Sequence, residues 1–210
     1  MARISFPEYA FPKLSRRPTE RGKKRFVFLI SPNPDPLEYI GPMNALRLAN
    51  FVFENSDVYD CGYEPEIISS EPGVVFEQHG LKLQVDKAYS ELEGDADTLV
   101  VSPMNWEDLF GRDDNLLPWL RKQQKVLRRI GSICSAAFVL AEAGILNGRR
   151  ATTHWDLVPD LQARYPEVIV DGKPLYVRDD NVYTAAGMTA GVDITIAMIE
   201  EDYGREVALR

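Results

Sequence analysis

The residue with the most distinctive chemical setting in this 210-residue chain is Cys134. Residues 129–133 have the pattern of a buried strand and residues 135–143 that of a helix, so Cys134 lies at a strand-to-helix corner. Small neighbours such as Ser132, Ser135 and Ala136 allow such a corner to project its side chain from the top of a sheet. The helix N-terminus that follows favours a thiolate. Cys134 is therefore a candidate nucleophile; the alternative is a cysteine packed in the corner.

Two more side chains are candidates to act with this cysteine. His154 follows the short strand pattern of residues 151–153 and could serve as a base or a hydrogen-bond partner. Glu38 is expected in the loop after the first strand, four positions before Pro42. Loops of this kind converge at the carboxyl ends of parallel strands. The alternatives are a structural histidine packed against Trp155 and an ordinary surface glutamate.

Strand and helix patterns alternate along most of the chain. Apolar runs predict strands at 26–31, 63–69, 97–102, 129–133 and 182–184, with shorter strands at 81–85, 151–153, 168–170 and 176–178. Helical spacing is present from about Pro42, over 116–128, 135–143 and 155–165, and from Gly191 to Tyr203. This alternation predicts an α/β fold with a doubly wound parallel sheet and helices on both faces.

Composition and charge narrow the class of protein. Two cysteines are too few for a disulfide framework or a zinc site. No apolar run approaches the roughly 20 residues of a membrane span, and no signal-peptide pattern is present, so we expect a cytoplasmic protein. The net charge is −8, but residues 1–25 carry +6, so the body is acidic and suits a polyanion poorly. Residues 1–24 are expected to form a basic extended arm that contacts DNA, lipid or an acidic neighbour, or is simply solvated.

Several segments, taken together, resemble a known family. EYIGP, ICSAAFVLAEAG, RRATTHW and TAAGMTAGVD occur in the order and at the spacings of ThiJ/PfpI domains, which are class I glutamine amidotransferase-like. Among these, the chain is most similar to the sensor half of AraC-family transcription regulators. The resemblance covers residues 25–207 and implies a flavodoxin-like sandwich, usually dimeric. In that subgroup an AraC-type helix-turn-helix domain follows, so we expect such a domain beyond Arg210.

The resemblance also implies roles for individual residues. Cys134 matches the elbow cysteine, Glu38 the acidic residue that faces it, and His154 the histidine near the elbow. Three departures weaken an enzymatic role. Ser135 stands where hydrolytic members have histidine, and Met104 and Asn105 replace the glycines of an oxyanion loop. In addition, Glu38 stands where the isonitrile-hydrating relatives have aspartate.

The leading hypothesis is a small-molecule sensor that is not an enzyme and requires no metal or cofactor. The effector would bind above the sheet beside Glu38, Met104, Asn105, Cys134, Ser135 and His154, and DNA would be bound only through the C-terminal domain. One alternative is a cysteine-dependent enzyme resembling isonitrile hydratase or an amidase, with Cys134 attacking and Glu38 moving a proton. Another is a redox sensor in which Cys134 is oxidised to a sulfinate that protonated Glu38 stabilises.

Overall fold

The computed structural model describes residues 13–76, 80–94, 96–103 and 115–210. Its centre is a six-stranded sheet in the order β2-β1-β5-β6-β10-β9, in which only the β9 edge strand is antiparallel to its neighbour. The strands are β1 (Gly22–Leu29), β2 (Cys61–Ile68), β5 (Thr98–Val101), β6 (Arg129–Ile133), β9 (Tyr176–Asp179) and β10 (Val182–Ala185). The predicted flavodoxin-like, mostly parallel sheet is confirmed.

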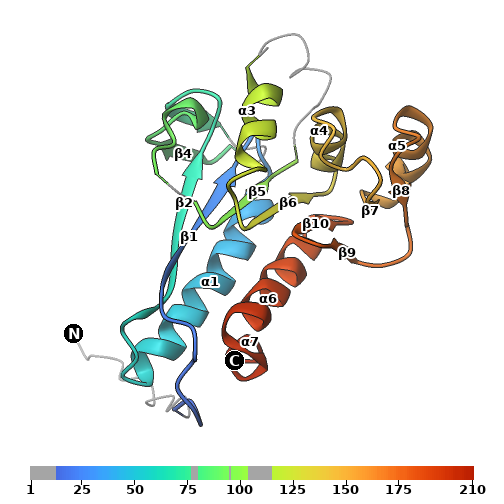
Figure 1. Cartoon of the computed structure of the whole chain (residues 1–210). Coiled ribbons are helices and arrows are strands. Elements are labelled where there is room, and N and C mark those ends of the chain that lie inside the picture. The colour runs from blue at the N-terminus through green and yellow to red at the C-terminus, as the bar shows by residue number, and fades with distance from the viewer. Residues whose placement is uncertain (1–12, 77–79, 95, 104–114) are drawn as a thin grey trace.

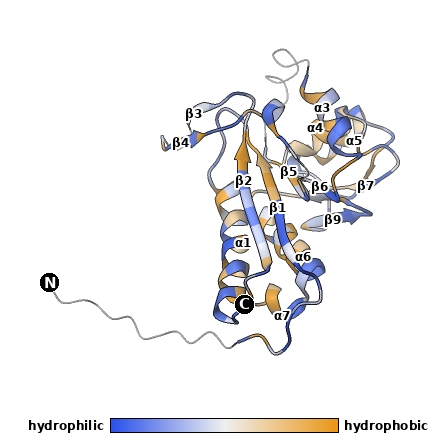
Figure 2. Ribbon diagram, turned by 60° about the vertical axis from the view of Figure 1, so that its left-hand side comes forward, coloured by the Kyte–Doolittle hydropathy of each residue, from blue (hydrophilic) through white to orange (hydrophobic). Residues whose placement is uncertain are grey.

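Helices cover both faces of this sheet (Figure 1). One face packs against α1 (Leu37–Asn55), α6 (Ala190–Tyr203) and the short α7 (Arg205–Ala208). The other face packs against α3 (Leu116–Gln123), α4 (Ala136–Glu142) and, further out, α5 (Val158–Arg164). Side chains of β1 alternate between the two cores: Phe26 and Phe28 join the first and Val27 and Leu29 the second. Figure 2 shows the hydrophobic colouring concentrated toward the carboxyl-end halves of β1 and β2.

Smaller elements flank the main sheet. β3 (Gly73–Phe76) and β4 (Lys82–Val85) form a hairpin, and η1 (Tyr89–Glu91) is one turn of 3₁₀ helix. β7 (Arg150–Ala151) pairs in parallel with β8 (Ile169–Val170), and η2 (Trp155–Leu157) leads into α5. Among the described residues, none of the helices is long and apolar enough to cross a membrane.

The three largest differences from the boundaries predicted from the sequence are in β1, α1 and α3. β1 begins at Gly22, inside the segment expected to be an arm, because residues 22–25 pair in register with residues 61–64 of β2. α1 begins at Leu37, five residues before the predicted start at Pro42. Pro42 therefore lies inside the helix, where it cannot donate a hydrogen bond to the Glu38 carbonyl four residues back. α3 ends at Gln123 because the chain turns before entering β6, so its helical spacing overestimated its length.

The start of β2 has no room for a side chain at Gly62. This residue has a φ of +121°, and an added Cβ would overlap the Asn50 amide oxygen. That oxygen accepts a hydrogen bond of 2.7 Å from the Tyr63 amide, while Asn50 Nδ2 donates to the Tyr63 carbonyl at 2.8 Å. Helix α1 is thereby fastened to the edge strand of the sheet.

We expect Gly62→Ala to lower the free energy of unfolding by about 2–3 kcal/mol, because backbone strain and overpacking add together. Urea denaturation followed by circular dichroism measures this change. Gly187→Ala is the matched control, since nothing lies within 4 Å of its added Cβ. Equal stability of the two variants would show that the β2 start relaxes around a methyl group.

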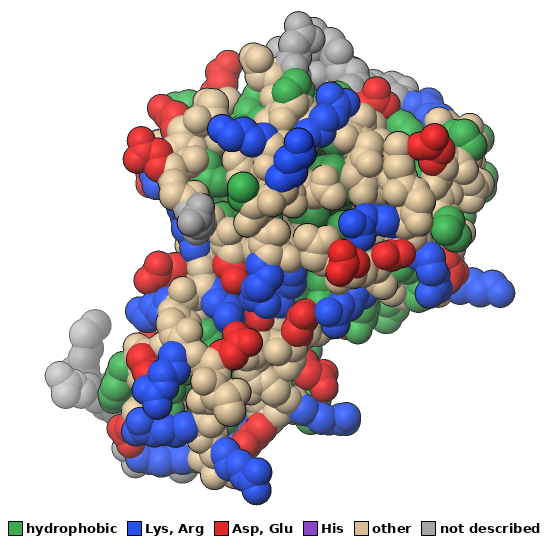
Figure 3. All heavy atoms as spheres, in the orientation of Figure 1, with side chains coloured by type: hydrophobic (Ala, Val, Ile, Leu, Met, Phe, Trp, Pro, Cys, Tyr) green, Lys and Arg blue, Asp and Glu red, His purple; other side chains and the backbone are tan. Residues whose placement is uncertain are grey.

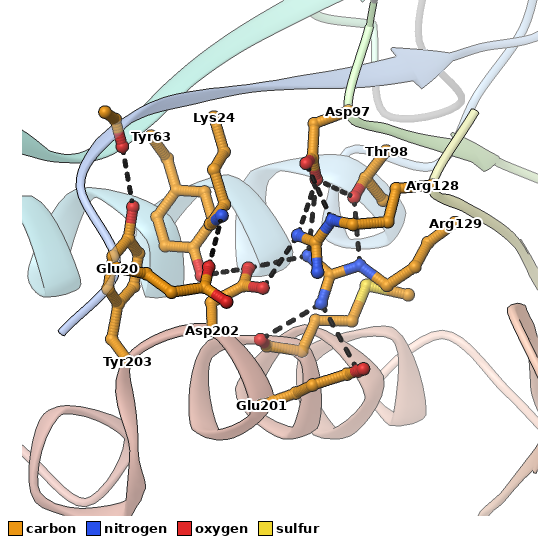
Figure 4. Close-up of polar contacts among 12 residues, drawn as sticks. Glu20, Lys24, Tyr63, Asp97, Thr98, Arg128, Arg129, Glu201, Asp202 and Tyr203 are labelled. Atoms are coloured by element: carbon orange, nitrogen blue, oxygen red, sulfur yellow. Dashed lines mark hydrogen bonds and ion pairs between the residues drawn. The ribbon is translucent and has the colours of Figure 1, made fainter. Parts of the chain in front are cut away.

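A buried ionic network joins the amino ends of the central strands to the last turn of α6 (Figure 4). Arg129, at the start of β6, is 1% exposed and lies 2.7 Å from the fully buried Asp202 carboxylate. Arg128 binds the other Asp202 oxygen at 2.7 Å, and Tyr63 of β2 donates to Asp202 at 2.8 Å. Asp97 accepts two bonds of 2.8 Å from Arg128. These contacts fix the end of α6 against three strands.

Candidate functional site

Cys134 is a strained corner residue between β6 and α4, as the sequence predicted. Its φ of +55° lies in the left-handed region that non-glycine residues seldom adopt. Neighbouring segments hold this backbone in place. The Cys134 amide donates to the Ala185 carbonyl of β10 at 2.9 Å, and Thr153 Oγ1 donates to the Cys134 carbonyl at 2.9 Å. The side chain is partly buried and packs against the core on the α1 and α6 side.

Glu38 lies in the first turn of α1 and not in a loop, which corrects the sequence interpretation. The side chain is only 5% exposed, and its Oε2 atom has no hydrogen-bond partner among the described residues. Its charge acts on the Cys134 thiol, so the structure brings the predicted acid and the predicted thiol together. An unpartnered buried carboxyl oxygen is costly and is a polar group that a ligand can satisfy.

The electrostatics of the pair correct the thiolate expectation. Burial raises the pKa of Cys134 to about 11; a hydrogen bond from the Ser135 backbone lowers it, and the Glu38 charge raises it further. Burial also raises the pKa of Glu38 to about 8, with the Asp35 charge adding to the rise and an Asp35 backbone hydrogen bond opposing it. Desolvation thus outweighs the N-terminus of the short α4 helix. At neutral pH the pair is a thiol beside a mostly protonated carboxyl group.

Two glycines bring the starts of α1 and α6 close to this pair. A Cβ on Gly191 of α6 would lie 2.7 Å from Ile133 Cδ1 and 3.4 Å from Pro42 Cγ. A Cβ on Gly41 would lie 2.9 Å from Val192 Cγ2. The helix bearing Glu38 therefore packs directly on the helix that follows β10, and both pack near the residue preceding Cys134. Side chains larger than hydrogen at these positions would force the helices apart.

The structure gives fewer contacts between the remaining predicted site residues and the pair of Cys134 and Glu38. His154 is partly buried, and its ring lies 5.3 Å from that of Trp155, which is the arrangement of the structural alternative. Within the described part of the chain, no hydrogen bond joins His154 to Cys134 or Glu38. Ser135 precedes α4, and its backbone contacts the thiol. Met104 and Asn105 lie outside the described residues, so their predicted ligand contacts stay a prediction.

Buried hydroxyl groups near the carboxyl ends of the strands were not predicted from the sequence. Ser102 follows β5, Ser132 belongs to β6, and Thr152 follows β7. All three are 0% exposed, and within the part of the chain that the structure describes their hydroxyl oxygens have no hydrogen-bond partner. The hydroxyl of Tyr39, the residue after Glu38 in the sequence, has none there either. Single serines and threonines in apolar strands carry no sequence signal of this kind, because it depends on burial.

A separate depression of about 440 Å³ lies along the β9 edge. Its walls consist of Arg150, Asp171, Lys173, Pro174, Tyr176, Val177 and Arg178. None of these is a predicted site residue, and Arg150 is paired with Asp171 at 2.9 Å. Among the residues that the structure describes, no group of three or more histidine, cysteine or acidic side chains could hold a metal ion.

The raised thiol pKa predicts slow alkylation of Cys134 at neutral pH. Because the thiolate is the nucleophile, the iodoacetamide rate should rise about tenfold per pH unit from pH 8 to 10. An unperturbed thiol levels off near pH 8.5. Peptide mapping by mass spectrometry separates Cys134 from Cys61, which is buried at the start of β2 and donates to the Glu20 carbonyl at 3.3 Å. A rate already at its maximum by pH 8 would contradict the environment described for Cys134.

The sheet order, the helices on both faces and the strained cysteine corner define a flavodoxin-like sandwich with a nucleophile elbow. Residues 24–201 match the DJ-1/PfpI family, and the chain belongs to that family. The resemblance to ThiJ/PfpI domains is thus confirmed.

Three relatives illustrate the similarity. The HTH-type transcriptional regulator CdhR of Pseudomonas aeruginosa is 31% identical over 88% of this chain and 52% of its own length. An isonitrile hydratase of Pseudomonas putida is 38% identical over 46% of this chain and 41% of its own length. The crystal structure of an AraC family transcriptional regulator from Pseudomonas putida superposes with a TM-score of 0.72 at 19% identity, covering 89% of this chain and 96% of that one. The chain spans about half the length of the regulator CdhR.

Proposed function

We propose that this domain senses a small polar effector and controls the DNA-binding activity of an AraC-type helix-turn-helix domain that follows it. The similarity to the regulator CdhR, which extends over 88% of the chain, is the observation that carries this proposal. The effector site is the edge of the sheet where Cys134 and Glu38 meet. We place the protein in the cytoplasm as a homodimer, and sedimentation analysis tests the dimer.

The chemistry of the site supports binding over turnover. The Cys134 thiol is protonated at neutral pH, so the nucleophile of a covalent reaction is scarce. Glu38 Oε2 and the hydroxyls of Ser102 and Tyr39 are buried and lack hydrogen-bond partners in the described ranges of the chain, and a ligand with several donors and acceptors can satisfy groups of this kind. The same protonated thiol argues against a redox sensor, because oxidants act on the thiolate.

A thermal-shift screen of small amines, amides and amino-acid derivatives tests this proposal. We expect at least one compound to raise the melting temperature of the wild type through binding to the folded state. Its affinity should fall about tenfold or more in Glu38→Leu, which fills a similar space but removes both carboxyl oxygens from the site. Glu64→Leu, the same change at an exposed position on β2, is the control. Stabilisation that is equal in both variants, or absent for every compound, would reject the site.

An enzyme is the second candidate, because the isonitrile hydratase shares 38% identity over 99 residues. In that reading Cys134 attacks the substrate and Glu38 transfers a proton. Turnover of isonitriles or amides near 1 s⁻¹ or faster, lost in Cys134→Ala, would favour the enzyme over the sensor. A helix-turn-helix sequence in the reading frame after residue 210 would favour the sensor.

A further inference from the structure

A basic surface lies at the amino end of the sheet, opposite the Cys134 edge. The segment 13–24 and the chain after α6 meet there. The backbone amide and hydroxyl of Ser15 donate to the Glu206 carboxylate of α7 at 2.9 and 2.5 Å, and Arg210 Nη2 donates to the Lys13 carbonyl at 3.4 Å. Figures 1 and 2 both show this segment beside α7 at the lower end of the molecule. We call residues 13–24, 56–60 and 205–210 the basal face.

The basal face is strongly cationic although the protein is acidic. It contains eight basic and four acidic residues, a surplus of four positive charges in a chain whose net charge is −8. The basic residues are Lys13, Arg16, Arg17, Arg21, Lys23, Lys24, Arg205 and Arg210, and the acidic ones are Glu20, Asp57, Asp60 and Glu206. Figure 3 shows lysine and arginine side chains projecting from this lower end. Two exposed carboxylates, Glu54 and Glu200, border it.

Local partners already neutralise the acidic residues of this face. Lys13 pairs with Asp57, Arg21 with Asp60 at 2.6 Å, Lys24 with Glu20 at 2.8 Å, and Arg210 with Glu206 at 2.7 Å. The other four cations are exposed and, within the described part of the chain, have no carboxylate within ion-pair distance. These are Arg16, Arg17, Lys23 and Arg205. The surplus charge is therefore available to an external anion.

We infer that the basal face binds the phosphate backbone of double-stranded DNA. This inference rests on the proposed function. A helix-turn-helix domain that follows Arg210 would be connected to the sensor domain beside α7, so DNA bound to it would lie near the basal face. Four cations on two adjacent segments suit a repeating anion, and contacts of this kind position a protein without reading sequence. The elbow lies at the other end of β1, whose eight residues span roughly 26 Å.

Fluorescence anisotropy with a short labelled duplex, measured against salt concentration, tests the inference on this chain. Four phosphate contacts predict a slope of log affinity against log salt of about −3 to −4. The variant Arg16→Gln, Arg17→Gln, Lys23→Gln, Arg205→Gln should bind at least about tenfold more weakly at low salt and show a slope near zero. Removing the bordering carboxylates in Glu54→Gln, Glu200→Gln should strengthen binding.

A control variant with the same change in net charge distinguishes the effect of the basal face from the effect of the overall charge. Arg47, Lys122, Lys125 and Lys173 are exposed outside the basal face, and replacing all four by glutamine should change affinity less than about twofold. Equal loss in both quadruple variants would overturn the inference, as would absence of duplex binding at low salt or binding of phosphatidylserine vesicles in its place. A negative result for DNA binding would not count against the proposed effector site, because the thermal-shift screen tests binding at the Cys134 edge.

Discussion

Replacing Asp202 with alanine is expected to lower the free energy of unfolding by about 3–5 kcal/mol, a large share of the stability of an ordinary domain. The reason is that the positive charge of Arg129 would remain buried without its carboxylate partner. Arg129 is 1% exposed and cannot reach water, and Asp202 is its nearest carboxylate at 2.7 Å. Glu201 and Asp97 lie 3.5 Å from the same guanidinium, which is too far to replace a buried, hydrogen-bonded partner. Urea denaturation gives the free energy directly.

Two further variants make this expectation specific. Asp57→Asn removes the partner of an exposed lysine and should leave stability unchanged within error, because water screens that pair. In the double variant Asp202→Leu, Arg129→Met, both buried charges are replaced by apolar groups, and most of the lost stability should return. A loss below about 1 kcal/mol for Asp202→Ala would show that water or a neighbouring carboxylate compensates the arginine.

The architecture could be predicted from the sequence because its strands and helices have strong local patterns of apolar and turn-forming residues. The run Phe26–Ile30 is apolar throughout, as expected of a strand covered on both faces, and Gly144 has the positive φ of a helix-ending glycine. The network around Arg129 and Asp202 could not be predicted from the sequence. These residues are 73 positions apart. In the sequence Arg128 reads as the basic end of a helix and Arg129 as the first residue of a strand, with no sign that either is paired with a buried aspartate.

The corner at Cys134 was predicted from the sequence, whereas the roles of the candidate site residues stay a prediction. Small residues around Cys134 indicated a tight strand-to-helix turn, and the structure has Cys134 in such a turn with a positive φ. The expected thiolate is wrong because a sequence shows the helix that follows but not how far water is excluded. Glu38 was placed in a loop because Pro42 suggested a helix start. Pro36 stands immediately before the actual helix, which an N-terminal proline rule could have identified.

Glu38 should make the stability of the domain fall as pH rises through the neutral range. The folded-state pKa is about 8, above the ordinary 4.5 that the unfolded chain retains. Unfolding therefore releases a proton between these values, so the contribution of Glu38 to stability is greatest below pH 4.5 and decreases toward pH 8. The loss from this one residue is on the order of 5 kcal/mol.

Glu38→Gln isolates that contribution, because glutamine cannot ionise and fits the same space. Relative to wild type, the variant should gain stability steadily from pH 4.5 to 8, and the difference should level off above pH 8 once the wild-type carboxyl group is ionised in both states. Urea unfolding of both proteins at half-unit pH steps measures it, with Glu64→Gln on the exposed face of β2 keeping the wild-type profile. Parallel curves for wild type and Glu38→Gln would mean that the buried carboxylate has a hydrogen-bonding or cationic partner that stabilises its charge. The site would then suit an anionic carboxylate at pH 7 and not the neutral carboxyl donor inferred beside Cys134.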